Sequence, residues 1–201
     1  MKMTTRRLLA ALSLGAVLVS AQAFSATERN YVVDGAHSSA SFKVKHLMSK
    51  TTGNFKDFSG TFSFDEKNPK AFQGSFTVKA DTIFTNEAKR DEHLKNADFF
   101  NVAKHPALSF VAKELKAAGK NKYKMSGDFT MLGVTKAVSF DMEYLGAGKD
   151  PWGNEKVGFS ASGKINRKDY GMVWNKALDT GGFLVGDEVE IDVQVEGNAQ
   201  K

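Results

Sequence analysis

The sequence predicts an all-β protein of about eight antiparallel strands, and two features of the chain support this. Apolar and polar residues alternate with a period of two along most segments beyond the N-terminus. Glycines, prolines and polar clusters interrupt the alternation at the spacing of an antiparallel meander. A single sheet of so many strands usually curls or splits. The pattern therefore predicts either a closed barrel or a sandwich, and does not choose between them.

The N-terminus has the features of a secretory signal peptide. Three basic residues and no acid precede an apolar run of 12 residues, from Leu8 to Val19. This run is shorter than the ~20 residues that a membrane-spanning helix needs. Ala21-Gln22-Ala23 provides the small residues that signal peptidase requires, so cleavage is expected after Ala23. We expect residues 1–23 to be removed on export and residues 24–201 to form one domain in the periplasm.

The composition excludes several classes of function. The chain has no cysteine, which excludes disulfides, thiolate catalysis and cysteine-based metal sites. Removing the three basic residues of the signal leaves 25 Lys and Arg against 23 Asp and Glu. A chain so close to neutral lacks the basic footprint of a nucleic-acid-binding protein. The 16 phenylalanines, spread over many short segments, predict a wide apolar interior.

The first part of the exported chain is predicted to consist of short strands separated by turns. The segments are a strand at 31–34, a strand at 39–47, a turn or bulge at 53–60, an apolar strand face at 62–64, a polar turn at 65–70 and a strand at 74–80. In the second strand, Phe42, Val44 and His46 share one face, which predicts a half-buried strand. The glycines at both ends of 53–60 are the reason for predicting a turn there.

The stretch Asp81–Pro106 interrupts the β pattern and is predicted to contain a helix. Thr85 or Asn86 can cap a helix that runs to about Asn96, with Glu87 in its first turn. A proline follows His105 and ends the connection, because the residue before a proline is pushed into an extended conformation. A single helical insert in an all-β chain is either a plug for one end of a barrel or a place for chemistry.

Alternating strands resume after this insert. They cover 108–112, 123–132, 138–144, 157–165 and 189–195, with a lysine-rich turn near 119–121, a tight turn at 133, a loop at 146–154 and an irregular passage at 169–186. The inward faces of these strands carry many phenylalanines and methionines. Gly127 and Gly163 are expected to leave gaps between them. From the pattern alone, this lining fits either a filled core or a cavity for a long apolar ligand.

Neither a metal site nor a catalytic site is predicted. His37, His46, His93 and His105 have no ligand spacing, and a metal would require three or four such groups to converge from separate segments. The stretch Asp91-Glu92-His93, together with Asp98, could supply an acid–base pair, but no nucleophile motif accompanies it. The simpler interpretation is that Arg90 and Asp91 belong to a hydrogen-bonded network that ties the insert to nearby strand ends.

An ordered set of short motifs resembles the YceI-like family of polyisoprenoid-binding proteins along the whole exported chain. The matching stretches are Asp34-Gly-Ala-His-Ser38, Phe42-x-Val44-x-His46-Leu47, Gly53-x-Phe55-x-x-Phe58-x-Gly60, Asn86-x-x-x-Arg90-Asp91-x-His93-Leu94, Ala97-Asp98-Phe99-Phe100, Gly127-x-Phe129-Thr130-x-x-Gly133-Val134-Thr135-Lys136, Asp150-Pro-Trp-Gly153, Gly158-Phe159 and Asp169-Tyr170-Gly171. No single motif is diagnostic, but the set in this order is highly specific.

The resemblance implies a lipocalin-like, eight-stranded antiparallel β-barrel in the periplasm, with a tunnel for a polyisoprenoid or similar lipid such as a quinone tail or a polyprenyl phosphate. It implies no enzyme activity and no cofactor beyond a co-purifying isoprenoid lipid or quinone. The partners that it implies are the lipid, transiently a membrane surface, and a second copy of the chain, since some members form dimers. An exported enzyme at the barrel mouth and a β-sandwich interaction module with a filled core remain the alternatives.

With this resemblance, the apolar lining is expected to form the tunnel and the polar cluster of the insert to receive the head group. The expected tunnel residues are Phe42, Val44, Phe62, Phe76, Phe110, Met125, Phe129, Phe140 and Phe159. The expected mouth residues are Asn86, Arg90, Asp91 and His93. Arg90 could pair with a phosphate, and Asn86 or His93 with a quinone carbonyl.

Overall fold

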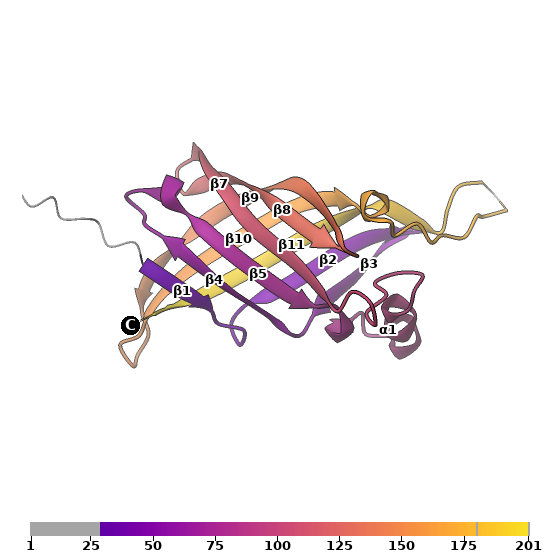
Figure 1. The fold of residues 1–201 in the computed structure, drawn as a ribbon, viewed down its shortest axis with the longest axis horizontal. Coiled ribbons are helices and arrows are strands. Elements are labelled where there is room, and N and C mark those ends of the chain that lie inside the picture. The colour runs from indigo at the N-terminus through magenta and orange to yellow at the C-terminus, as the bar shows by residue number, and fades with distance from the viewer. Residues whose placement is uncertain (1–28, 180, 201) are drawn as a thin grey trace, which may run out of the picture.

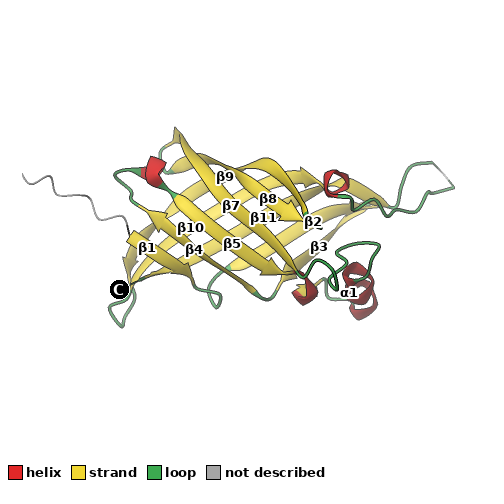
Figure 2. Ribbon diagram, in the orientation of Figure 1, coloured by secondary structure: helices red, strands yellow, loops and turns green. Residues whose placement is uncertain are grey.

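The computed structural model describes residues 29–179 and 181–200, so the expected signal peptide lies outside the described residues. The elements in chain order are β1 (Arg29–Val33), β2 (Ser39–His46), β3 (Ser49–Phe55), β4 (Phe58–Phe64), η1 (Pro69–Ala71), β5 (Gln73–Lys79), η2 (Ala80–Thr82), β6 (Ile83–Phe84), α1 (Ala88–Lys95), β7 (Ala107–Gly119), β8 (Lys122–Met131), β9 (Val134–Lys149), β10 (Glu155–Asn166), η3 (Arg167–Tyr170) and β11 (Val185–Ala199). The strands form the wall of an elongated barrel, and the helical segments lie at its ends (Figure 2).

The strands close into an eight-stranded antiparallel barrel, which confirms the predicted fold class. The closed ring runs β1-β4-β5-β7-β8-β9-β10-β11 and returns to β1. The return contact pairs Tyr31 with Ala199, so the first and last strands of the described chain are neighbours. The ring has no free edge and excludes the sandwich alternative. In Figure 1 the long strands cross the barrel axis obliquely, as closure of a barrel requires.

At three of the eight positions in the ring, the wall is made of two separate strands, each covering one part of the barrel's length. Beside β11, residues 185–194 pair with β2 and residues 197–199 pair with β1. The next position is formed by β3 beside β2 and by β4 beside β1. The position after that is formed by β6 beside β3 and by β5 beside β4. These extensions lengthen the barrel at the end where α1 lies (Figure 1).

The glycines at 53–60 do not form the turn that the sequence predicts. The turn between β3 and β4 is confined to Lys56 and Asp57, while Gly53 and Gly60 lie within the strands. A Cβ atom at either glycine would come within 3.0 Å of a phenylalanine ring on the adjacent strand. These glycines therefore allow close approach of a neighbouring ring, which sequence reasoning does not distinguish from a turn.

The stretch between β6 and β7 covers the side of the barrel at its α1 end. Among the described strands, β6 pairs only with β3, so hydrogen bonding does not continue from β6 to β7. Phe99, Phe100 and Leu94 fill this position by packing with Ile83 of β6 and Leu108 of β7. The predicted insert thus has a structural role, because it closes the gap in the barrel wall between β6 and β7. None of the described helices is long and apolar enough to cross a bilayer.

The helix begins later than predicted, and its cap is Glu87. The Glu87 side chain accepts hydrogen bonds from the backbone N–H of Lys89 and Arg90, at 3.2 and 2.7 Å. Neither predicted cap has this role. Asn86 has a positive φ of 63°, a left-handed conformation that asparagine tolerates better than most residues. The Thr85 hydroxyl is instead bonded to Asp91.

Aromatic residues close the opposite end of the barrel. The ring of Phe64 lies 5.1 Å from that of Tyr144 and 4.9 Å from that of Phe159, measured between centroids. Leu115 and Val157 pack in the same buried cluster and are almost inaccessible to solvent. Burying this cluster contributes to stability in the ordinary way of a packed core.

Candidate ligand-binding site

The interior of the barrel contains two cavities with mainly apolar walls. The first has a volume of about 170 Å³ and lies within the middle of the barrel, and the second, about 260 Å³, lies at the α1 end. Phe64, Tyr123 and Tyr144 line neither cavity, although all three are buried. The first cavity is therefore separated from the far end of the barrel by packed side chains.

All nine residues expected to line a tunnel lie on the walls of these cavities. Eight are on the wall of the first cavity, and Val44 is on the wall of the second. The interior is thus not the filled core of the alternative interpretation. Occupation of these walls by a ligand remains a prediction.

Several interior phenylalanine rings lie against glycines of a neighbouring strand. A Cβ atom would come within 3.0 Å of Phe42 at Gly53, of Phe76 at Gly60 and of Phe140 at Gly163. Gly127 and Gly163, expected to leave gaps, are instead covered by the rings of Phe110 and Phe140. Because glycine has no side chain, each ring can lie close to the wall rather than projecting into the lumen. The pattern keeps space open in a barrel that is rich in large side chains.

The two cavities share a ring of wall residues. Five side chains line both of them, and they are Phe42, Phe55, Leu108, Phe129 and Ile191. The rings of Phe42 and Phe55 are 5.8 Å apart between centroids. The two cavities therefore meet end to end, and a chain entering the second would pass this ring to reach the first.

The second cavity reaches the surface beside α1, where the predicted mouth residue Arg90 lies. Arg90 is exposed to solvent and also lines the cavity. Its Nε donates to Thr85 Oγ1 at 2.7 Å and its Nη2 donates to Thr85 O at 2.8 Å. An arginine has five N–H donors, and no other acceptor bonds to this one within residues 29–179 and 181–200. Arg90 is thus oriented by Thr85 while part of its guanidinium stays available.

His93 lies next to Arg90 on the wall of the second cavity. Its Nε2 is 3.0 Å from Asp98 Oδ2, and its ring makes edge contacts of 5.0 Å with both Phe99 and Trp174. Trp174 belongs to the irregular segment before β11 and also lines the cavity. The mouth is therefore built from two segments far apart in the sequence, the insert and the segment before β11.

The other two predicted mouth residues are not on the cavity wall. Asn86 is exposed and forms the left-handed turn before α1. Asp91 is buried, and its Oδ1 accepts from the backbone N–H and the hydroxyl of Thr85, at 2.8 and 2.5 Å. Arg90 and Asp91 thus meet at Thr85, in the network expected to tie the insert to a strand end.

Arg167 is a cavity residue that sequence reasoning missed. It is only 2% exposed, and its guanidinium donates to the carbonyls of Gly186, Met172 and Trp174 at 2.8–2.9 Å. Burial lowers the pKa of Arg167, whereas the nearby Asp187 carboxylate acts in the opposite direction. Continuing the alternation of β10 by one step beyond Ile165 would have placed Arg167 on the inner face.

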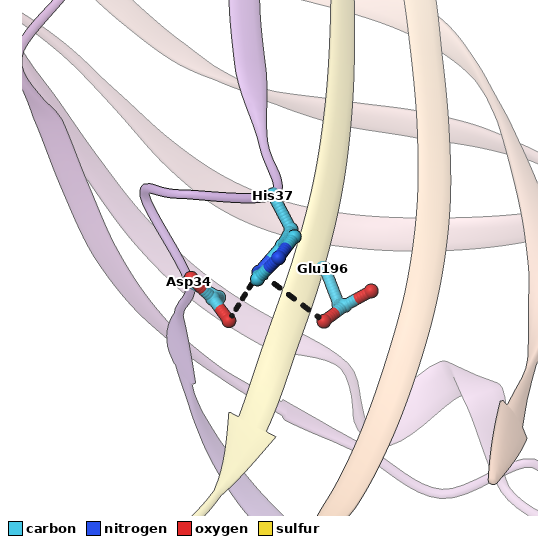
Figure 3. Close-up of side chains that lie close together, drawn as sticks. All are labelled: Asp34, His37 and Glu196. Carbon is cyan, nitrogen blue, oxygen red and sulfur yellow. Dashed lines mark hydrogen bonds and ion pairs between the residues drawn. The ribbon is translucent and has the colours of Figure 1, made fainter. Parts of the chain in front are cut away.

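Asp34, His37 and Glu196 form a cluster outside the cavities that resembles a metal site (Figure 3). Their ligand atoms lie within 4.8 Å of one another. However, the ammonium group of Lys156 donates to the same two carboxylate oxygens, at 2.8 Å for Asp34 and 2.9 Å for Glu196. The lysine already supplies the positive charge, so the cluster fits an ionic clasp between the turn after β1 and the strand β11 better than a metal site.

Comparisons with known proteins agree with this architecture. A sequence model described as the YceI-like domain matches residues 31–197. The UPF0312 protein ECA1782 of Pectobacterium atrosepticum is 44% identical over 193 residues, which cover 94% of this chain and 97% of that protein. Protein YceI of Escherichia coli O157:H7 is 42% identical over 180 residues, which cover 88% of this chain and 91% of that protein.

Solved structures show the same fold. The YCEI protein of Campylobacter jejuni is 35% identical, with a TM-score of 0.67, and the match covers 78% of this chain and 90% of that one. BcnA of Burkholderia cenocepacia is 24% identical, with a TM-score of 0.73 and coverage of 82% and 98%. A polyisoprenoid binding domain from Saccharophagus degradans is 14% identical, with a TM-score of 0.62 and coverage of 85% and 98%. The last two show likeness of fold alone.

Proposed function

The chain belongs to the YceI-like family, and we propose that it binds a long-chain polyisoprenoid or a similar amphipathic lipid, such as a quinone tail or a polyprenyl phosphate. Binding is non-covalent, and the protein sequesters or transports the lipid in the periplasm. The observation that carries this proposal is the pair of adjoining apolar cavities, which share five wall residues, and the second of which has the exposed Arg90 on its wall at the α1 end. The name of the Saccharophagus degradans domain supports testing this class of lipid first.

The two adjoining cavities suit an apolar chain that extends from one cavity into the other. Each five-carbon unit removed from water contributes roughly 3 kcal/mol before the costs of binding are subtracted. The wall offers only weak polar anchoring, so chain length and shape determine affinity more than specific hydrogen bonds do. Eight of the nine tunnel residues named from the sequence lie on the wall of the first cavity.

A head group would lie beside Arg90 and His93 at the mouth. The free N–H groups of Arg90 suit a phosphate, and the His93 ring suits a quinone carbonyl. Asn86 and Asp91, which lie away from the wall, support the mouth through the turn before α1 and through Thr85. Both remain in the proposal with this supporting role.

Analysis of lipids bound to the protein tests the central proposal. Protein isolated gently from its native host is examined by native mass spectrometry, and its lipid extract is identified. We expect a bound species with a prenyl chain, and delipidated protein should take up a prenyl lipid added in detergent. A protein that carries no lipid from its host and takes up none of the added chains would refute the proposal.

A substitution at the mouth distinguishes the contribution of the head group to affinity from that of the prenyl chain. Arg90→Gln is expected to weaken binding of a prenyl phosphate by about tenfold or more, because a charge-assisted hydrogen bond contributes about 1.5–3 kcal/mol. Binding of the prenyl alcohol of the same length should weaken much less, because loss of the bonds from Arg90 to Thr85 affects both ligands alike. Lys89→Gln is the matched control, since Lys89 is the adjacent cation and does not line the cavity. Equal affinity of wild type and Arg90→Gln for the phosphate would remove Arg90 from this role.

The remaining parts of the proposal concern location, partners and catalysis. The periplasmic location rests on the N-terminal pattern, and cell fractionation tests it. Pairing with a second copy of the chain rests on the family resemblance, and light scattering tests it. We propose no enzyme activity. His93 and Asp98 make an acid–base pair, but no hydroxyl in the described part of the chain hydrogen bonds to either side chain.

A further inference from the structure

We infer that the α1 end of the barrel docks on the surface of a phospholipid bilayer, and that residues 47–48, 173 and 183 are its contact surface. We call these residues the rim. The inference deepens the proposed function, because it names the place from which the lipid enters. It rests on that function only for its lipid-transfer readout, and the docking itself is tested separately.

The rim presents apolar side chains to solvent. Met48 is 100% exposed, Val173 64% and Phe183 62%, and Leu47 is also exposed. Scattered apolar residues are normal on a protein surface. Here, however, they belong to the turn between β2 and β3 and to the segment between η3 and β11, and both lie at the same end of the barrel as α1 (Figure 1).

Three of these exposed residues, Leu47, Val173 and Phe183, are direct sequence neighbours of residues that line the second cavity, and Met48 is one position further along the chain. His46 lines the cavity and Leu47 is exposed; Leu184 lines the cavity and Phe183 is exposed. Val173 lies between Met172 and Trp174, both of which line it. The chain therefore gives the mouth an apolar inner wall and an apolar outer surface at adjacent positions. Binding a lipid inside the barrel needs only the inner wall.

Two parts of the rim, the turn at 47–48 and the segment that contains Phe183, are held together by backbone hydrogen bonds. The backbone N–H of Leu47 donates to the carbonyl of Leu184 at 3.1 Å, and His46 pairs with Val185 in the sheet. The turn at 47–48 and the segment at 183–184 are thus fixed side by side. An apolar surface that is held in place loses little conformational entropy when it enters the interface of a bilayer.

Lysines around the rim indicate that the bilayer carries negative charge. The hairpin from 43 to 50 contains three lysines and no acidic residue. One of them, Lys50, pairs with Glu190 at 2.6 Å, whereas Lys45 has no ion pair among the described residues. Lys176, on the other segment, is exposed and likewise has no ion pair in the described part of the chain. Exposed apolar side chains flanked by lysine are typical of surfaces that bind anionic lipid interfaces.

An exposed aromatic residue at the opposite end provides a control. Trp152 is 83% exposed, in the turn between β9 and β10, close to the end closed by packed aromatic rings. Neither cavity is lined by residues of that turn. If exposed hydrophobicity alone caused membrane binding, Trp152 would contribute as much as the rim.

The experiment compares wild type, the double variant Met48→Ser/Phe183→Ser and the control Trp152→Ser, each confirmed as folded by circular dichroism. Vesicles of phosphatidylethanolamine and phosphatidylglycerol are floated with each protein, and transfer of a prenyl lipid out of them is timed. We expect the double variant to bind vesicles and to extract lipid at least about tenfold more weakly than wild type. Trp152→Ser should behave as wild type, and added salt should weaken binding by wild type.

Uptake of the same lipid from detergent tests lipid binding inside the barrel separately from docking by the rim. The double variant should take up lipid from detergent as well as wild type does, because its cavity is unchanged. If all three proteins extract lipid from vesicles equally, or if Trp152→Ser fails as the double variant does, docking by the rim is wrong while lipid binding stands. If wild type does not float with anionic vesicles, the inference is also overturned. If wild type takes up no lipid by either route, the proposed function fails, and flotation alone still decides the docking.

Discussion

At the scale of single residues, Gly163 shows how a barrel rich in phenylalanine keeps an open lumen. Only side-chain atoms of Phe140 lie in the space that a Cβ at Gly163 would occupy. The backbone can therefore tolerate a small side chain there, but the ring cannot remain where it is. An added methyl group would push Phe140 from the wall toward the first cavity, whose wall it helps to form.

Gly163→Ala is accordingly expected to reduce lipid uptake and to cost about 1–3 kcal/mol of stability through overpacking. Gly148→Ala is the matched control, because a Cβ at Gly148 would meet no atom within 4 Å. Titration with a prenyl lipid and urea unfolding measure the two effects. Equal lipid uptake by the two variants would show that the ring of Phe140 does not limit the lumen.

Asp34 is expected to make the stability of the fold depend on pH. Hydrogen bonds from Lys156 and His37 hold the pKa of Asp34 well below its ordinary value of 3.8. A carboxyl group whose pKa is lower in the folded state stabilises the fold above its unfolded pKa, and that contribution is lost as the pH falls through the folded pKa. The clasp between the turn after β1 and β11 should therefore be intact at neutral pH and weaken in strong acid.

Asp34→Asn should cost about 2 kcal/mol near pH 7, since hydrogen bonds to a charged group are lost. Below about pH 4 the difference from wild type should shrink, because Asp34 takes up a proton in the unfolded chain there, whereas the folded protein keeps this carboxylate ionised to lower pH. Urea unfolding at several pH values measures both effects. Asp141→Asn, which removes an exposed ion pair with Lys124, is the control and should cost less than about 1 kcal/mol. A difference that stays constant down to pH 2 would contradict this assignment.

At the scale of elements, the helix α1 depends on tertiary contacts more than on its own sequence. It has eight residues, and Asp91 is its only buried one. Isolated helices of this length are unstable in water. The bonds from Thr85 to Asp91 and from Arg90 to Thr85 therefore hold the helix to the end of β6. The stability of the mouth depends on this small network.

Asp91→Ala leaves the buried N–H and hydroxyl of Thr85 without their acceptor, which should cost about 2–3 kcal/mol. Hydrogen exchange should accelerate in residues 85–105 and much less in the strands β7–β10. A bound lipid should also dissociate faster. Glu92→Ala is the control, because Glu92 is largely exposed and, among the described residues, forms an ion pair only with Lys95. Uniform acceleration over the whole barrel would mean that the helix is not a separate unit.

At the scale of the whole molecule, a ligand that fills the lumen should stabilise the barrel. A free lipid concentration of 100 times the dissociation constant raises the free energy of unfolding by about 2.7 kcal/mol. This corresponds to a rise in Tm of roughly 5–10 °C for a domain of this size. Calorimetry of delipidated protein with and without a long prenyl lipid tests this. A single-unit prenyl alcohol, which covers little of the wall, should give a much smaller rise. Equal shifts with both would indicate binding outside the lumen.

The strands and their inner faces could be predicted because the period of two is a local property of the chain. Side chains alternate across any extended segment, wherever its partner strand lies. The nine lining residues therefore follow from single segments such as 39–47, and the family motifs narrowed the fold to a barrel. The roles of Gly53 and Asn86, and the choice of Thr85 as the partner of Asp91, could not be predicted in this way, since each depends on a neighbour that the local pattern does not specify.

By itself, then, the sequence determined an all-β chain with a phenylalanine-rich inner face and one helical insert. Only the tertiary structure decided that the wall closes, through pairing of β1 with β11, and that glycines hold rings against that wall. It also brought Arg167 and Trp174 to the same cavity as Arg90 and His93. The reason is physical: alternation fixes which way a side chain points, whereas closure, register and cavity shape depend on contacts between segments far apart in the chain.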